Sequence, residues 1–243
     1  MKLRLLIFFL ICSSHVEAGV IKSKMNGFES FVQGELEWLN LSYTKNQNWS
    51  EIEQRINSGD LSMLNLRYAD FDEVLSLFQT SFIAFNTPSN IHEWESHFQV
   101  SNVADNHLNL FARDVDEFIE KTGADFQSFS GQTAGYPVDF RSFSAVYGEK
   151  IEVSDIMFGT NMLRYSVNIQ DVLNFQPDPL ASTAWDNASI GKQPTVRNYD
   201  THHNAHFLVR KATVVSEPGA LTLLFTAMIA VFSRRKILKS LHK

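Results

Sequence analysis

The order of apolar and polar residues predicts short helices in the first half of the chain. Residues 50–53 and 70–73 each begin with serine or aspartate and end three positions later with glutamate. Such capping boxes mark helix starts, because the two polar groups satisfy backbone N–H groups that the first turn leaves unpaired. Behind the second box, apolar residues recur with the spacing of one helix face at Phe71, Val74, Leu75 and Phe78.

Other segments of the first half also fit regular elements. The expected helices cover residues 50–57, 90–98 and 110–121, and the expected strands cover residues 27–32, 36–41 and 64–68. Gly123 follows the last of these helices, where glycine readily takes the left-handed backbone of a helix end.

The second half of the chain changes to strand-like patterns. Short runs rich in β-branched and aromatic residues occupy residues 140–147, 151–158, 163–169 and 206–214. Helices that precede strands, without βαβ alternation, favour an α+β domain. We therefore expect early short helices and a late antiparallel sheet.

Composition indicates a folded domain with an acidic surface. The chain has 20 Phe and 4 Trp, which supply apolar area for a core. Asp and Glu number 27 against 21 Lys and Arg, for a formal net charge of −6 at pH 7. An acidic surface repels nucleic acid, so we expect no nucleic-acid partner. The single cysteine, Cys12, excludes a disulfide framework.

The N-terminus has the pattern of a secretory signal. Lys2 and Arg4 precede a short apolar run at residues 5–11, and small residues follow before Gly19. We expect a signal peptidase to remove residues 1–18, which include Cys12.

The C-terminus has the pattern of a membrane anchor. Pro218 precedes an uncharged, mostly apolar run, and we expect a transmembrane helix at about residues 220–233. A basic cluster ends it: Arg234, Arg235 and Lys236. This cluster predicts that the far end stays cytoplasmic. A buried core helix is the alternative interpretation of the same run.

This combination resembles the PEP-CTERM sorting signal of Gram-negative bacteria. Ser216, Glu217 and Pro218 occupy the Pro-Glu-Pro motif, with Ser216 in place of the first proline. The resemblance implies that an exosortase cuts near this motif and removes a tail within residues 216–243. The body, residues 19–215, would be anchored in the inner membrane before cleavage and reach the cell surface or extracellular matrix, such as that of a biofilm, afterwards.

A second resemblance covers the body. A Glu-Trp-Leu-Asn-Leu opening at residues 37–41, an Arg-Tyr-Ala segment at 67–69 and a closing Phe-Leu-Val-Arg strand at 207–210 resemble exported PEP-CTERM proteins of unassigned function. The same order is loosely similar to bacterial C-type-lectin-like domains. This resemblance implies a lectin-like fold that opens with a Trp strand and ends in a Val-Arg strand.

The same residues also have a purely structural interpretation. Trp38 and Leu41 would enter the core from a strand, and Phe207 and Val209 would alternate along a closing strand, with the N- and C-terminal strands adjacent. Arg67 would pair with an acidic helix start, at Asp72 or Glu73.

Metal-binding patterns are weak. His202 and His206 are four residues apart, as in helical zinc pairs, but they lead into an apparent strand, so a polar loop is the alternative. Asp114, Asp116 and Glu117 fit a solvated helix face. Calcium in late loops, at Asp178, Asp186 and Asn187, is the one cofactor that the lectin-like resemblance allows.

Catalytic motifs are absent from the sequence. It has no Gly-x-Ser-x-Gly elbow, and carboxylate pairs for glycoside cleavage cannot be picked out by spacing. We expect a non-catalytic surface or matrix protein that binds polysaccharide. Trp185, beside Asp186 and Asn187, is the candidate for sugar contact, with a packed loop anchor as the alternative. A secreted hydrolase of matrix polysaccharide and a structural protein without a ligand are the alternative functions.

Overall fold

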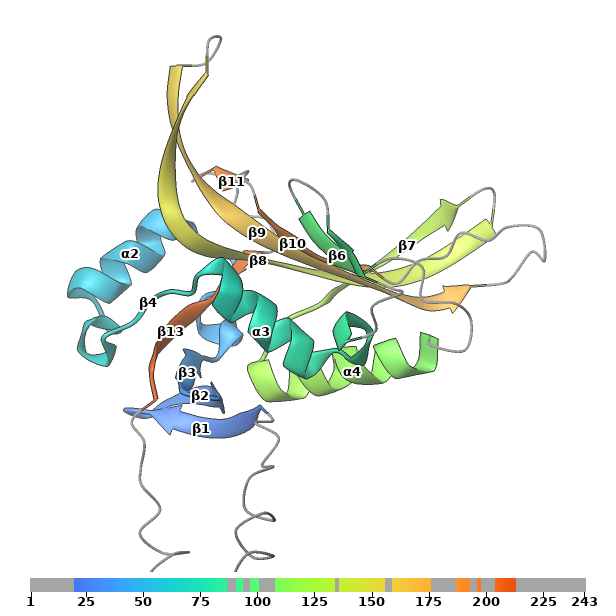
Figure 1. Cartoon of the computed structure of the whole chain (residues 1–243), viewed down its shortest axis with the longest axis horizontal. Helices are drawn as coiled ribbons and strands as arrows, with labels where there is room; N and C mark the ends of the chain where they lie inside the picture. Colours follow the sequence, from blue (N-terminus) through green and yellow to red (C-terminus); the bar gives the residue numbers. More distant parts are fainter. Residues whose placement is uncertain are drawn as a thin grey trace, which may run out of the picture. The chain divides into compact units, whose positions relative to one another are not determined.

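A computed structural model describes residues 20–86, 91–93, 97–100, 108–133, 136–155, 159–175, 187–192, 196–197 and 204–212. These residues form an α+β domain with two largely antiparallel sheets and three α-helices, as Figure 1 shows. The predicted α+β class is therefore confirmed.

The first sheet joins both ends of the described chain. Its strands lie in the order β1 (Ile21–Met25), β2 (Phe28–Gln33), β3 (Leu36–Leu39), β13 (Leu208–Lys211) and β4 (Arg67–Tyr68), and each neighbouring pair is antiparallel. The predicted adjacency of N- and C-terminal strands is confirmed for β3 and β13, because Val209 lies opposite Trp38.

The strands expected at 27–32 and 36–41 are confirmed as β2 and β3, whereas β1 was not predicted, so a complete strand hairpin and a third strand come before the first α-helix. The Asn26-Gly27 pair is the local sequence signal for the turn between β1 and β2. Both residues have positive φ, at 49° and 94°, as a tight hairpin turn requires. The strand expected at 64–68 is shorter than predicted, since Ser62–Leu64 form a 3₁₀ turn and only Arg67–Tyr68 pair.

The second sheet is built on a long hairpin. Strand β8 (Tyr136–Asp155) pairs with β9 (Gly159–Phe175), and a register shift lies between Tyr147 and Ile151. The two strands expected at 140–147 and 151–158 are thus parts of one bulged strand. The remaining strands are β5 (Ile91–Glu93), β6 (His97–Val100), β7 (Gln127–Thr133), β10 (Asn187–Gly191), β11 (Val196–Arg197) and β12 (Asn204–His206).

The order in this sheet is β12-β8-β9-β10-β6-β5, with β7 on β8 and β11 on β9. Only β12 runs parallel to its neighbour among the described pairs. The helix expected at 90–98 is wrong, because Phe98 lies opposite Ile190 in the β6–β10 pair. Pairing with a distant strand has overridden a short helical period.

The helices are α2 (Trp49–Ser58), α3 (Phe71–Ser81) and α4 (Leu108–Thr122). The capping box of α3, Asp70 with Glu73, is confirmed. The box of α2 is Asn48 with Glu51 rather than Ser50 with Glu53. This earlier start brings Trp49 into the first turn, where it is buried, and leaves Glu53 free for other partners.

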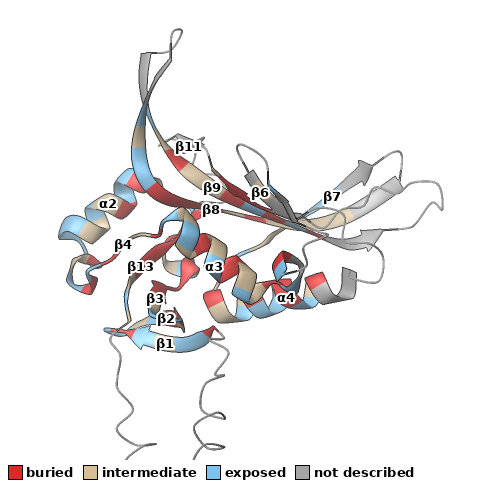
Figure 2. Ribbon diagram, viewed as in Figure 1, coloured by how far each residue is buried: buried red, intermediate tan, exposed pale blue. Residues whose placement is uncertain are grey.

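Phe207 stands at the centre of the core. Its ring contacts Trp38 of the first sheet, Phe78 of α3 and Phe143 of the second sheet, at centroid distances of 6.0, 6.4 and 6.5 Å. Figure 2 shows the buried residues along these facing elements. Such edge-to-face ring pairs add to the free energy of burial, so Phe207 ties both sheets and a helix into one core.

Replacing Gly123 tests the packing at the end of α4. Gly123 has a φ of 70°, and a Cβ there would lie 2.0 Å from Asn40 Oδ1, the atom that caps the 3₁₀ turn Leu41–Tyr43. We expect Gly123→Ala to lower the free energy of unfolding by about 2–4 kcal/mol, from backbone strain and a lost cap.

Gly34→Ala is the matched control, measured by the same denaturant titration. Gly34 has a φ of 60°, and a Cβ there meets no atom within 4 Å. It should cost only about 1–2 kcal/mol. Equal losses in the two variants would show that the contact with Asn40 does not matter.

Candidate functional site

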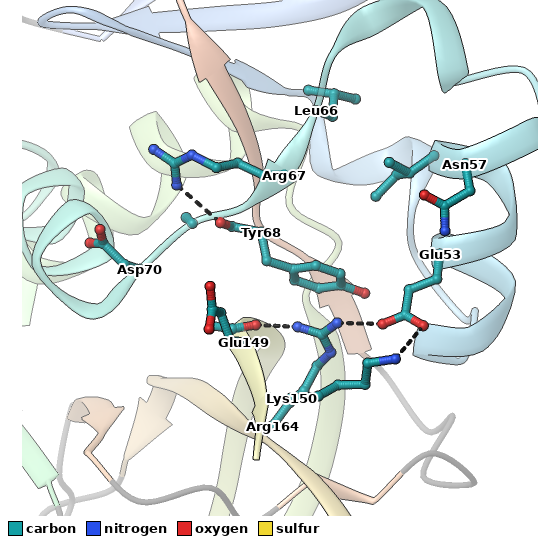
Figure 3. A pocket seen from close by; sticks show the side chains of 12 residues that line it. Glu53, Asn57, Leu66, Arg67, Tyr68, Asp70, Glu149, Lys150 and Arg164 are labelled. Carbon is teal, nitrogen blue, oxygen red and sulfur yellow. Dashed lines mark hydrogen bonds and ion pairs between the residues drawn. The ribbon is translucent and has the colours of Figure 1, made fainter. Parts of the chain in front are cut away.

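A polar cleft of about 740 Å³ opens where α2, β4, β8 and β9 meet, as Figure 3 shows. Its lining is dominated by charged and amide side chains around one aromatic ring. The lining residues are Glu53, Ile56, Asn57, Leu66, Arg67, Tyr68, Ala69, Asp70, Gly148, Glu149, Lys150 and Arg164.

The floor of the cleft is a buried arginine stacked on a tyrosine. Arg164 is only 4% exposed, and its guanidinium carbon lies 3.6 Å from the centre of the Tyr68 ring. Its Nη2 donates to Glu53 Oε1 at 2.6 Å, and its Nη1 donates to the carbonyl of Gly148. A desolvated cation over an aromatic face is attracted to the ring electrons, so the Arg164 side chain is held in place from three sides.

Glu53 pairs with two cationic side chains, Arg164 and Lys150. Its second oxygen, Oε2, accepts a hydrogen bond from Lys150 Nζ at 2.9 Å. Partial burial acts to raise the pKa of Glu53, but the hydrogen bonds from Lys150 and Arg164 outweigh it and hold the pKa below its ordinary value. The carboxylate therefore stays ionised at neutral pH.

Tyr68 is fixed by a histidine beneath the cleft. His206 Nε2 donates to the Gln47 carbonyl at 2.9 Å, which leaves Nδ1 to accept from the Tyr68 hydroxyl at 3.0 Å. Burial lowers the pKa of His206 to about 4, so the ring is neutral at pH 7. Burial also raises the pKa of Tyr68 well above its ordinary value, so the phenol remains a donor.

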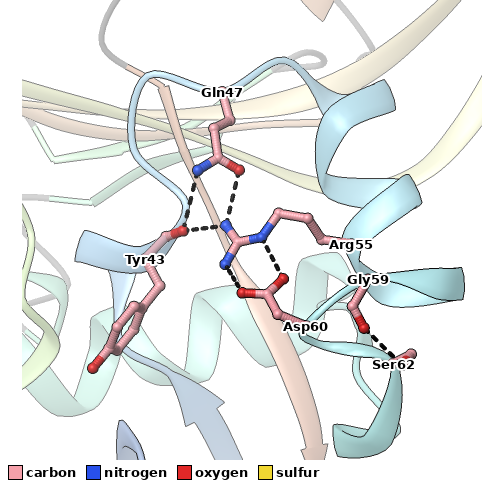
Figure 4. A network of polar contacts seen from close by, with 6 residues as sticks. All are labelled: Tyr43, Gln47, Arg55, Gly59, Asp60 and Ser62. Atoms are coloured by element: carbon pink, nitrogen blue, oxygen red, sulfur yellow. Dashed lines mark hydrogen bonds and ion pairs between the residues drawn. The ribbon is translucent and has the colours of Figure 1, made fainter.

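A second polar network, shown in Figure 4, positions Gln47 itself. Arg55 of α2 donates through Nη1 to the Tyr43 carbonyl at 2.5 Å and to Gln47 Oε1 at 2.9 Å. Its Nε and Nη2 bind both oxygens of Asp60, each at 2.8 Å. The fork-shaped pairing with Asp60, which follows α2, orients the Arg55 guanidinium. The Nη1 bonds then hold the loop before α2, and Gln47 in that loop positions His206.

The rim is formed by the start of α3. Arg67 donates to both oxygens of Glu73, at 2.7 and 2.5 Å, which confirms one of the two predicted acidic partners. Asp70 accepts from the Glu73 backbone N–H at 2.9 Å and is otherwise exposed beside the cleft. The Arg67 pair closes one wall, while Asp70 and Glu149 leave carboxylate oxygens at the opening.

The predicted sorting and sugar-contact residues fall mostly outside the described chain. This holds for Ser216, Glu217, Pro218, Arg234, Arg235, Lys236, Trp185 and Asp186. The transmembrane helix expected at 220–233 lies outside it as well, and no helix among the described residues combines the length and apolar character needed to cross a membrane. Asn187 begins strand β10 opposite Gln170, so its expected position in a loop is wrong.

The other candidate residues are placed differently from the prediction. His206 is buried rather than part of a polar loop, while His202 lies outside the described residues. Asp114 is also buried and accepts the Ile83 N–H at 2.7 Å, so only Asp116 and Glu117 keep the expected solvated face. Within the described ranges, no three metal-ligating side chains come together.

Most residues of the cleft have no functional signal in the sequence around them. The Arg-Tyr-Ala segment that includes Tyr68 was singled out, but without a functional role. Glu53, Lys150 and Arg164 carry no local signal, because Arg164 and Glu53 are 111 positions apart in the chain.

Comparison of the chain with known protein families, with characterised proteins and with solved structures finds no match. The function must therefore be inferred from the cleft and from the sequence.

The buried histidine predicts a pH-dependent stability. A group whose pKa is lowered in the folded state stabilises the fold above its unfolded pKa, and this contribution is lost as the pH falls toward the folded value. For His206 the window runs from 6.5 to about 4, and the loss is about 3 kcal/mol. Denaturant unfolding at pH 7, 5.5 and 4 measures it.

The comparison variant is His206→Gln, whose amide can keep one of the two hydrogen bonds without titrating. Its stability should fall less between pH 7 and 4 than that of the wild type. Parallel pH profiles for the two proteins would contradict the assignment.

Proposed function

We propose that this is a non-catalytic exported protein of the cell surface or extracellular matrix whose body binds polysaccharide through the Tyr68–Arg164 cleft. One observation carries the proposal: an open cleft that combines fixed donors and acceptors with an aromatic residue. Sugar hydroxyl groups can both donate and accept hydrogen bonds. Small-ligand sites commonly have volumes of about 300–1,000 Å³. The 740 Å³ cleft lies within this range.

The charge of the cleft favours an uncharged ligand. Three carboxylates and three cations line it, and the pairs around Glu53 balance one another. A neutral sugar can accept from Lys150 or Asn57 and donate to Asp70 or Glu149. Because these side chains project from β8, α2 and the start of α3, binding would require little reordering of the backbone.

Hydrolysis of the same polysaccharide fits the cleft less well. Glycoside cleavage usually needs a carboxylic acid that keeps its proton near neutral pH, which requires a raised pKa. Glu53, the carboxyl deepest in the cleft, has a lowered pKa instead. Asp70 is engaged in capping α3. These observations favour binding over turnover at this site.

Two further features support the proposed class. The lectin-like resemblance implies a Trp strand at the opening and a Val-Arg strand at the close, and both segments are strands here, β3 and β13. The apolar run at residues 220–233 and the basic cluster after it support anchoring in the inner membrane and sorting by an exosortase. We propose both as parts of one function, delivery of a glycan-binding domain.

A glycan-binding screen of the purified full-length protein, with calcium and with a chelator, tests the binding role. We expect at least one polysaccharide to be retained without being cleaved. Asn57→Ala and Lys150→Gln should each weaken binding about three- to tenfold, the effect of losing one hydrogen bond.

Lys45→Gln is the matched control for Lys150→Gln. Lys45 also forms an exposed ion pair, with Asp125 at 3.0 Å, but it does not line the cleft. The affinity of the Lys45→Gln variant for the polysaccharide should match that of the wild type. Release of shortened glycan would favour the hydrolase, and a silent screen would favour a structural protein.

Sorting is tested separately by mass spectrometry of the protein from host cells with and without an exosortase. We expect the mature chain to begin at Gly19 in both strains and to end near Glu217 only when the exosortase is present. Full-length chain in the soluble cell interior of both strains would contradict export and sorting alike.

A further inference from the structure

A second, smaller hollow adjoins the cleft. It measures about 260 Å³ and is lined by Trp49, Ser50, Glu53, Lys150 and Met162. Glu53 and Lys150 also line the larger cleft, so the two hollows share a wall. Trp49 and the 43% exposed Met162 line the smaller hollow only.

The shared wall is an ion pair that is easily rearranged. The Lys150 and Glu53 side chains are 39% and 26% exposed, and their N–O distance is 2.9 Å. Partly exposed pairs of this kind contribute little to stability, because water screens them. Arg164 holds the other oxygen of Glu53, so Lys150 can move to a ligand without leaving Glu53 unpaired.

Each hollow has a buried donor in its lining that lacks a partner among the described residues. These donors are Arg164 Nε beside the larger cleft and Trp49 Nε1 beside the smaller hollow. The two side chains are only 4% and 6% exposed. A buried donor without an acceptor is costly, and a ligand hydroxyl or a water held by the ligand would provide one.

We propose that the two hollows form one groove that binds at least two consecutive units of a polysaccharide chain. The larger cleft holds one unit among its polar side chains. The next unit crosses the Glu53–Lys150 pair and lies mainly against the exposed Met162, beside the small exposed part of Trp49, since the apolar face of a sugar ring suits such a surface. This inference rests on the proposed function and adds that the ligand is an extended chain rather than a single sugar.

The test is the dependence of affinity on chain length. Full-length protein is titrated with oligomers of β-1,4-linked N-acetylglucosamine and of β-1,4-linked glucose, from one to six units, by calorimetry and by ligand-observed NMR. We expect the affinity for at least one series to rise at least tenfold between one and three units and then to level off.

Variants of the smaller hollow test whether the rise in affinity with chain length comes from contacts there. Met162→Ser and Trp49→Phe should lower the ratio of hexamer to monomer affinity about three- to tenfold. Trp49→Phe keeps an aromatic ring but removes the indole N–H, and a thermal melt checks that each variant is folded. Met63→Ser is the control for Met162→Ser, because Met63 is 83% exposed and lines neither hollow. It should leave the ratio unchanged.

The outcomes separate this inference from the function on which it rests. Equal affinity for monomer and hexamer, with binding still dependent on Asn57, would overturn the two-unit groove and leave the proposed function standing. The same holds if Met162→Ser weakens monomer and hexamer binding alike. Failure of every oligomer to bind the wild type would count against the proposed function, and the groove with it.

Discussion

The two sheets are held together where the chain passes from one to the other at Phe207. The preceding residues belong to β12 of the second sheet, and the following residues belong to β13 of the first. The Phe207 N–H donates to the Val146 carbonyl, and its own carbonyl accepts from the Ala69 N–H, both at 2.9 Å. Its ring fills the space between Trp38, Phe78 and Phe143. A single residue thus provides both backbone hydrogen bonds between the sheets and aromatic contacts in the core.

The cleft is a consequence of this junction. Ala69 is joined to Phe207 on one side, and its carbonyl accepts from the Gly148 N–H at 2.7 Å on the other. This bond brings β4 against the bulge of β8. Gly148 has a φ of 77°, and a Cβ there would lie 2.4 Å from the Tyr165 ring, so only glycine allows the approach. Tyr68, next to Ala69, is thereby brought over Arg164.

Burying Arg164 has an energetic cost that the surrounding groups offset. Removing a guanidinium from water is unfavourable, and a paired buried charge often stabilises a fold no better than apolar side chains of similar size. Here Glu53, the Gly148 carbonyl and the Tyr68 ring each compensate part of the cost. A buried charge pair of this kind is therefore only weak evidence for stability.

A layered polar scaffold lies behind the cleft. Asp60 fixes Arg55, Arg55 fixes Gln47, and the Gln47 carbonyl sets the tautomer of His206, which in turn orients Tyr68. Each step is a hydrogen bond between groups with defined geometry, so the Tyr68 ring has little freedom. A binding surface that is fixed before the ligand arrives loses less conformational entropy on binding.

The sequence by itself determined the features that depend on nearby residues. The capping box of α3, the end of α4 at Gly123, and the turn between β2 and β3 all follow from side chains within a few positions of one another. The core positions of Trp38 and Phe207 were also predictable, because large aromatic residues in strands are rarely left in water.

Tertiary structure alone decided the rest. Strand β6 pairs with the distant strand β10, and β5 pairs with β6 in turn, although the residues of both have a helical period. Tyr68 and His206 are 138 positions apart, and Glu53 and Arg164 are 111 apart. The residues near Glu53 and Arg164 in the chain do not indicate that these two side chains will meet. The cleft could therefore not be predicted from the sequence, because its chemistry comes from contacts that only the complete fold creates.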